Sequence, residues 1–161
     1  MERFANTTEN MMKSKLTLAL VAATLAASAQ AQVKVEDAIK WRQANYATMG
    51  WNMGRIKASL DGAYNKDEVI QAANVIQAIA NSGMGKLYVP GSDKGSGFHE
   101  TKVKPELFTE GAKVGKIAGD FNAAANDLAK VAATGDAAAV KAAFGKLGGT
   151  CKSCHDDFRN K

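Results

Sequence analysis

The sequence predicts an all-helical protein, arranged as an antiparallel up-down-up-down four-helix bundle. Four segments after residue 31 carry apolar residues at helical spacing, and none shows the β-branched alternation expected of strands. Most connections between these segments are short, which favours antiparallel neighbours. A length of 161 residues, 46% of them apolar, suits a single core, so we expect one folded domain over residues 32–161.

The first 31 residues are interpreted as a secretory signal peptide that is removed. A basic start at Met12-Lys13-Ser14-Lys15 precedes an apolar run from Leu16 to Ala27 and an A-x-A cleavage site at Ala29-Gln30-Ala31. The run is too short to span a bilayer, which needs about 20 apolar residues. We therefore expect a periplasmic protein with no membrane helix after cleavage. The residues leave three starts open, namely Met1, Met11 and Met12.

Polar start and stop signals bound the first two predicted helices. The first runs from about Val35 to Leu60 and is stopped by Asp61-Gly62. The second begins after Asn65, a suitable N-cap, and ends near Ser82-Gly83. The inward stripe of the first helix consists of apolar or large residues at helical spacing, namely Ile39, Tyr46, Met49, Met53, Ile56 and Leu60.

A Gly-rich connection separates this pair from the last two predicted helices. Five glycines and Pro90 fall between Gly83 and Lys104, too many for a helix throughout. Pro105 suits the first position of a third helix that runs to Thr134-Gly135, and Asp136 caps a fourth. Three glycines on the third helix leave a groove that would admit a neighbouring helix or a flat ligand, namely Gly111, Gly115 and Gly119.

Charge and composition exclude several classes of function. Cleavage would remove three basic and two acidic residues from a chain of formal charge +5, leaving +4 spread over many lysines. Without a basic run interleaved with aromatic residues, we expect no binding to nucleic acid. No paired carboxylates, nucleophile triad or phosphate loop stands out, so we expect a binding protein rather than an enzyme.

The pentapeptide Cys151-Lys152-Ser153-Cys154-His155 carries the chemistry, because C-x-x-C-H is typical of covalent haem attachment. Two thiols on one helical turn can each add to a vinyl group of the same porphyrin, and the next residue offers its imidazole to the iron. We therefore predict one haem c per chain, held by Cys151 and Cys154, with His155 as axial ligand.

The two cysteines could also serve in a disulfide, in a redox pair or in a zinc site. A disulfide in a structural or chaperone-like bundle would also use two cysteines in an exported chain. A thioredoxin-like redox pair would need a preceding strand, and none is visible. A zinc site would need further ligands, and the only other histidine is His99, which we expect to face solvent in the Gly-rich loop.

The position of the motif limits where a sixth iron ligand could come from. Only six residues follow His155, and none of them is Met or His. Any further ligand must come from upstream. This excludes the arrangement in which the haem motif lies near the N-terminus and a later Met completes the iron.

A C-terminal C-x-x-C-H on the last helix of a four-helix bundle, followed by Arg159, resembles cytochrome c′. The likeness covers the mature chain, including residues 36–43 and 142–145. It implies a five-coordinate, high-spin haem iron that binds nitric oxide and carbon monoxide and hardly binds dioxygen. It also implies a homodimer packed through the first two helices. Phe108 stands where many members have Trp.

The resemblance also assigns roles to other residues. Arg42 and Gln43 match a first-helix pair near the haem propionates, which a guanidinium can bind in two places. Glu100 and Thr101 fall in a segment at the haem edge. Arg159, four residues after His155, matches a basic residue on the same helix face as the ligand.

Tyr46 is the most informative of these positions, because the resemblance places it over the open side of the iron. Low-spin relatives with the same bundle place a ligating Met in this register, so Tyr favours an open but guarded site. Tyr46 could instead be an ordinary core aromatic, and Met49, one turn away, could be the sixth ligand. We expect Met53 to serve in packing.

The sequence therefore predicts a gas-binding haem protein with a role in nitric oxide tolerance and a secondary capacity for electron transfer. The alternative is a low-spin electron-transfer cytochrome with Met49 bound to the iron. The redox partner in the periplasm is not identified by the residues.

Overall fold

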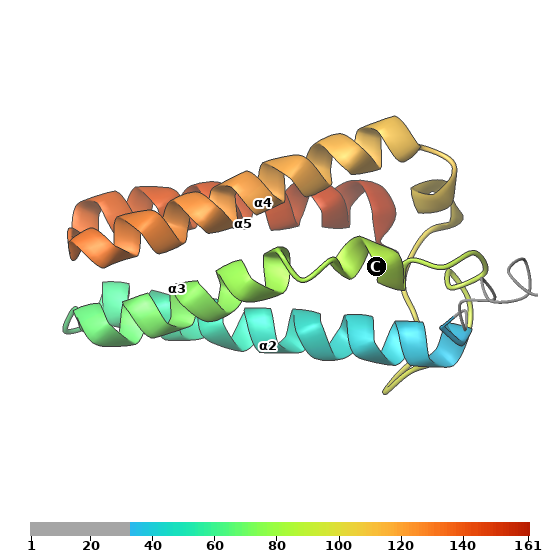
Figure 1. The fold of residues 1–161 in the computed structure, drawn as a ribbon, viewed down its shortest axis with the longest axis horizontal. Coiled ribbons are helices and arrows are strands. Elements are labelled where there is room, and N and C mark those ends of the chain that lie inside the picture. Colours follow the sequence, from blue (N-terminus) through green and yellow to red (C-terminus); the bar gives the residue numbers. More distant parts are fainter. Residues whose placement is uncertain (1–32) are drawn as a thin grey trace, which may run out of the picture. The chain divides into compact units, whose positions relative to one another are not determined.

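The computed structural model describes residues 33–161, so the predicted signal peptide lies outside the described residues. Within residues 33–161 the secondary structure is helical, apart from two isolated β-bridges. None of the described helices is long and apolar enough to cross a membrane. The four α-helices are α2 (Val35–Asp61), α3 (Lys66–Ala80), α4 (Gly111–Thr134) and α5 (Ala137–Phe158) (Figure 1).

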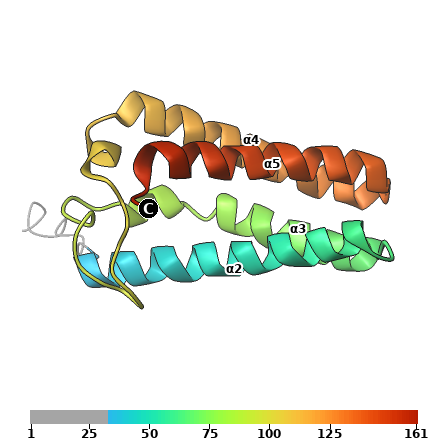
Figure 2. The ribbon, with the colours of Figure 1, turned by 180° about the vertical axis from the view of Figure 1, so that it is seen from behind.

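The helices form the predicted up-down-up-down bundle. Each packs chiefly against the next in sequence, α2 on α3, α3 on α4 and α4 on α5 (Figures 1 and 2). Short turns join α2 to α3 and α4 to α5 at one end. The long connection, with 3-10 turns at Met84–Leu87 (η1) and Pro105–Phe108 (η2), lies at the other end beside the C-terminus. The first and last helices, α2 and α5, contact each other only sparsely.

Side-chain caps begin two of the helices where the sequence predicts them. Asn65 accepts a hydrogen bond from the backbone N–H of Glu68 at 3.1 Å and starts α3. Asp136 accepts two backbone N–H bonds and starts α5. Gly135, with a φ of 79°, ends α4 in the left-handed conformation that glycine adopts without strain. Local sequence thus determines the tight turn between α4 and α5.

The main apolar core fills the end of the bundle that holds the short turns. It contains many alanines, so the helices approach one another closely there. A second, smaller group of buried apolar residues lies outside it, namely Ala38, Ile39, Leu107 and Phe158. The main core consists of Met49, Ile56, Val69, Ala72, Ala73, Ile76, Ala80, Met84, Ala124, Ala125, Leu128, Ala129, Ala132, Val140, Ala143 and Leu147.

The third helix does not begin at Pro105 as predicted. Pro105 begins the short η2 turn, which buries Leu107, and α4 starts only at Gly111. The backbone N–H of Lys104 donates to the carbonyl of Phe158 at 2.9 Å, so contact with the end of α5 sets the direction of the chain here. Glu110 departs from helical dihedrals (φ −99°, ψ 46°), and the chain turns there before α4 begins.

The glycine groove of the third helix does not receive a neighbouring helix. A Cβ atom built at Gly111, Gly115 or Gly119 would meet no other atom within 4 Å. These glycines therefore face open space rather than a close helix contact.

Candidate functional site

The C-x-x-C-H motif occupies the last two turns of α5. Cys151 and Cys154 are half-buried free thiols, and the three-residue spacing places them on one face of the helix. His155 follows at once and is exposed. This donor set, two adjacent thiols and an imidazole, fits covalent attachment of haem and axial ligation of its iron.

A band of lower burial crosses α2 and α5 at the level of the motif. On α2, Tyr46 is 42% exposed, although Arg42 and Met49 on either side of it are buried. On α5, the motif lies between Leu147 and Phe158, which are both buried. The main core ends on one side of this band and the smaller buried group lies on the other. Together with the sparse contact between α2 and α5, this arrangement fits a flat group between the two helices.

Two tyrosines meet in this band. The hydroxyl oxygens of Tyr46 on α2 and Tyr88, just after η1, lie 2.8 Å apart in a hydrogen bond. Burial raises the pKa of both side chains, and the thiol of Cys154 lies close enough to raise it further. Although much of the surface of Tyr46 is accessible, its hydroxyl is thus bonded to Tyr88 and influenced by charges and thiols of α2 and α5. Both tyrosines are neutral phenols at neutral pH.

Burial also affects the groups of the motif. It raises the pKa of the Cys151 and Cys154 thiols, so both are protonated at neutral pH. The pKa of His155 is lowered, first by burial and then by the positive charge of Arg159, against an opposing effect of Asp156. The imidazole is therefore favoured in its neutral form, which is the form that binds a metal.

Arg42 is buried and holds the long connection against α2. Its guanidinium donates to the Leu87 carbonyl at 3.3 Å, to Oγ and the carbonyl of Ser92 at 3.0 and 2.8 Å, and to Oγ1 of Thr101 at 3.0 Å. It also lies 4.6 Å from the centre of the Tyr88 ring. Within residues 33–161 no carboxylate forms an ion pair with it, and its two terminal nitrogens already donate to these four protein acceptors. Its contact with a propionate stays a prediction.

Gln43, the neighbour of Arg42, anchors the tip of the same connection. Its Oε1 accepts from the backbone N–H of Phe98, and its Nε2 donates to the carbonyl of His99, both at 2.8 Å. His99 is an exposed loop residue, as expected. Glu100 is exposed, and its backbone pairs with Ser96 in an isolated bridge. In the described part of the chain, no group of three His, Cys, Asp or Glu side chains could hold a metal ion.

Arg159 directly follows the last residue of α5, and its place on the helix face of His155 stays a prediction. The α5 helix ends at Phe158, and Arg159 is extended (φ −122°, ψ 130°) because its backbone pairs with Val103. Arg159 nonetheless donates its backbone N–H to the His155 carbonyl at 3.2 Å, and its charge acts on the imidazole. The bond to His155 has the i→i−4 spacing of an α-helix, and the bridge to Val103 ties the same residue to the long connection.

Met49 faces the main core. It is 6% exposed and belongs to the same cluster as Ile56 on α2. Met53 is partly buried against that cluster. This packing favours a structural role for Met49 over ligation of the iron.

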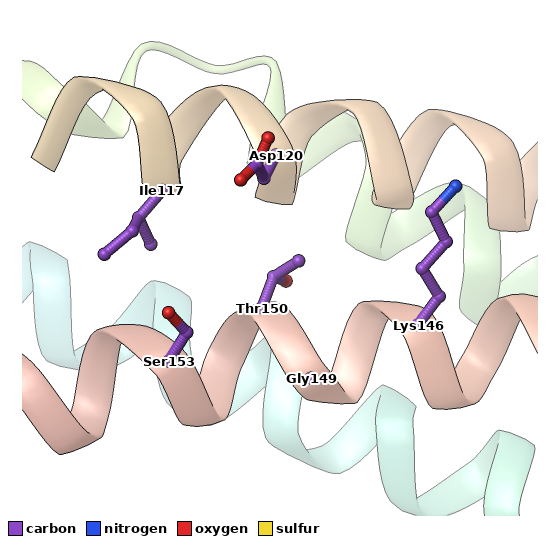
Figure 3. Close-up of a pocket in the computed structure, with 6 residues that line it drawn as sticks. All are labelled: Ile117, Asp120, Lys146, Gly149, Thr150 and Ser153. Carbon is purple, nitrogen blue, oxygen red and sulfur yellow. The ribbon is translucent and has the colours of Figure 1, made fainter. Parts of the chain in front are cut away.

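A shallow pocket of about 180 Å³ lies in the outer groove between α4 and α5 (Figure 3). Ile117 and Asp120 of α4 and residues of α5 line it. Ser153, between the two cysteines in sequence, points into this groove, on a different face of α5 from the thiols. The pocket is therefore separate from the face that carries the haem-attachment chemistry. Its α5 residues are Lys146, Gly149, Thr150 and Ser153.

Tyr88 is the residue that sequence reasoning missed. It lies in the Gly-rich connection, where no periodicity points to it. The signal that could have identified it is the apolar run Leu87-Tyr88-Val89-Pro90, which interrupts an otherwise small and polar segment. Such a run in a loop indicates contact with the body of the protein.

Comparison with known proteins gives consistent matches over the described domain. A family model described as Cytochrome C′ matches residues 37–159. A cytochrome c′ of Rhodocyclus tenuis is 64% identical over 129 residues, which cover 80% of this chain and 97% of that protein. The crystal structure of cytochrome c′ from Thermochromatium tepidum is 56% identical, with a TM-score of 0.78 over 81% of this chain and all of that one.

Other solved structures describe ligands and assembly in similar proteins. A cytochrome c′ with ligand-controlled dimer dissociation is 60% identical, with a TM-score of 0.78 over 81% of this chain and all of that chain. Cytochrome c′ variants from Alcaligenes xylosoxidans, 27% identical, are seen with carbon monoxide and with nitric oxide. Their TM-scores are 0.71 and 0.70, over 80% of this chain and 98% of theirs.

Proposed function

Because the chain belongs to the cytochrome c′ family, whose members hold haem c covalently, we propose that it is a periplasmic high-spin cytochrome that binds nitric oxide and carbon monoxide. When bound, the haem would supply an iron able to bind a small gas. His155 would bind that iron, and Cys151 and Cys154 would hold the porphyrin through thioether bonds.

The observation that carries this proposal is the tyrosine pair in the band across α2 and α5. Tyr46 lies within electrostatic range of both motif thiols, whereas Met49 is packed into the core. A phenol with a raised pKa stays protonated and is a poor iron ligand, so Tyr46 can occupy the gas position without binding the iron and a gas can displace it. The complexes of the Alcaligenes relative with carbon monoxide and nitric oxide support the same assignment.

The residues around the band have separate tasks in this proposal. The ring of Tyr46 crowds the gas position, and Arg42 would supply a positive charge on the side of a propionate. Binding of nitric oxide at such a site would serve in nitric oxide tolerance. The haem iron would also give the protein a secondary capacity for electron transfer. We propose no enzymatic turnover.

We also propose a homodimer through α2 and α3. Trp51 on α2 is 66% exposed, and Val75 on α3 is also exposed; apolar side chains of this kind are often covered by a partner. The similar protein with ligand-controlled dimer dissociation supports this assignment.

Optical spectra of the ferric and ferrous haem protein test the proposed function. We expect high-spin spectra that shift when carbon monoxide is added. A low-spin ferrous spectrum unchanged by carbon monoxide would contradict gas binding and favour the electron carrier with Met49 on the iron. Absence of covalent haem would remove both functions.

Substitution of Tyr46 tests how the gas position is guarded. Tyr46→Ala removes the ring and should raise the rate of carbon monoxide association. Tyr46→Phe keeps the ring and removes only the hydroxyl, so a smaller increase is expected. Equal rates in wild type and Tyr46→Ala would show that Tyr46 does not guard the iron.

A further inference from the structure

The hydrogen bond between Tyr46 and Tyr88 joins two segments of different kinds. Tyr46 lies in the middle of the long helix α2, whereas Tyr88 follows η1 in the Gly-rich connection. The two hydroxyl oxygens are 2.8 Å apart although 42 residues separate them in the sequence. The hydroxyl of Tyr46 is therefore not free in this structure, because Tyr88 already engages it.

Tyr88 is itself held in place by Arg42. The guanidinium lies over the Tyr88 ring at 4.6 Å from its centre, a cation–π contact. The same guanidinium donates to the carbonyl of Leu87, which directly precedes Tyr88, and to Ser92, which is completely buried. Both the ring and the neighbouring backbone of Tyr88 are thus fixed. If the two tyrosines part, Tyr46 is the one that moves.

Each of the two tyrosines carries one hydroxyl proton, and one hydrogen bond joins the two hydroxyl groups. Each neutral phenol can donate once and can also accept. Whichever hydroxyl donates, separation of the pair costs that bond. A neutral hydrogen bond of this kind changes an equilibrium by about two- to tenfold.

We infer that Tyr88 is a positioning residue that restrains Tyr46 and so limits the entry of gas to the iron. The inference rests on the proposed function, in which a gas must displace Tyr46 to reach its position. Tyr88 touches neither iron nor gas in this scheme and acts only through the hydroxyl of Tyr46. The hydrogen bond to Tyr88 makes displacement of Tyr46 more costly, and this cost adds to the steric hindrance from the Tyr46 ring.

A double-mutant cycle on the haem protein tests this restraint. Tyr88→Phe should raise the rate and affinity of carbon monoxide binding by about two- to tenfold, the range of one neutral hydrogen bond. Tyr46→Phe removes the same bond, so adding Tyr88→Phe to it should change nothing further. A Tyr88→Phe effect of equal size in the Tyr46→Phe background would overturn the inference, as would wild-type binding in Tyr88→Phe alone.

Tyr64 offers a matched control. It is the only other tyrosine of the sequence and lies at the turn between α2 and α3, away from the motif. Its buried hydroxyl has no hydrogen-bond partner among residues 33–161. Tyr64→Phe should leave carbon monoxide binding as in wild type. A change as large as that of Tyr88→Phe would mean that loss of any tyrosine hydroxyl loosens the protein, and would contradict a specific restraint.

Ultraviolet resonance Raman spectra of the ferrous protein without gas supply a second readout. They report the hydrogen bonding of tyrosine hydroxyls, so Tyr46→Phe should alter the Tyr88 signal and Tyr88→Phe the Tyr46 signal. Reciprocal changes combined with unaltered gas binding would overturn the restraint while the proposed function stands. A wild-type protein that binds no carbon monoxide would overturn both, whatever the Raman spectra show.

Discussion

The two ends of the bundle are held together by different forces. At the end with the short turns, small apolar side chains from four helices pack directly, and local caps such as Asn65 and Asp136 set the turns. At the motif end, the sparsely touching helices α2 and α5 are joined through a connection fixed by polar and aromatic contacts. The end with the short turns stabilises the fold and is set by local sequence signals. The motif end forms the candidate haem site and is built from residues that lie far apart in the chain.

The largest expected effect is at the motif. Replacing both cysteines, Cys151→Ser with Cys154→Ser, removes both thiols that bond the porphyrin, so covalent haem should be lost completely. Pyridine haemochrome analysis of the denatured chain measures this. Ser153→Ala is the control, because Ser153 points into the outer groove and its loss should leave haem content unchanged. Covalent haem in the double variant would refute the assignment of the motif.

A substitution in the main core should affect stability and not the site. Leu128 is completely buried, and Leu128→Ala should cost about 2–5 kcal/mol of unfolding free energy through lost burial and the cavity left behind. Urea unfolding of the haem protein followed by circular dichroism gives the value. The optical spectrum should stay that of wild type. A spectrum that shifted with Leu128→Ala would mean that the two ends are not independent.

Loss of Arg42 should weaken the motif end alone. Arg42→Met leaves the acceptors of Ser92, Thr101 and Leu87 without their donor and should cost about 1–3 kcal/mol. Urea unfolding is again the measurement. Lys57→Met, at an exposed ion pair with Asp61, is the control and should stay within about 0.5 kcal/mol of wild type. If the two variants lost the same free energy of unfolding, the buried hydrogen bonds of Arg42 would contribute no more than an ion pair on the surface.

The smallest expected effect concerns a half-buried ion pair that joins α2 to α3. Arg55 donates to Glu68 and holds the pKa of that carboxyl below its usual range. The stabilisation is therefore present above the ordinary pKa of glutamate and is lost as the pH falls through the lowered value in the folded protein. Thermal unfolding at neutral and acid pH should show a slight loss that Glu68→Gln lacks. A large acid-linked loss at this pair would mean that charges, not core packing, hold α2 to α3.

The same division separates what could be predicted from the sequence from what could not. The helices, the caps at Asn65 and Asp136 and the haem motif follow from local spacing, and the structure confirms the helices and caps. The start of the third helix at Pro105 was wrong, because the pairing of residues 102–104 with 158–160 overrides local propensity there.

Tyr88 could not be derived from spacing either. Its role depends on Arg42 and Tyr46, which come from another element more than 40 residues earlier. Periodicity describes one helix at a time and carries no information about which loop residue meets it. The conflict between local signals and tertiary contacts falls at the functional end of the molecule, where such conflicts are expected.

The pairing of residues 102–104 with the end of α5 also determines what closes the side of the bundle between α2 and α5. Thr101 accepts from Arg42 of α2, and Lys104 and Asn160 form the backbone bonds that tie this segment to the last helix. One side of the bundle is therefore closed by a peptide segment and a few hydrogen bonds instead of a helix interface. The closure of that side therefore depends on directional bonds between single groups, whereas the alanine-rich end depends on the area of apolar surface that it buries.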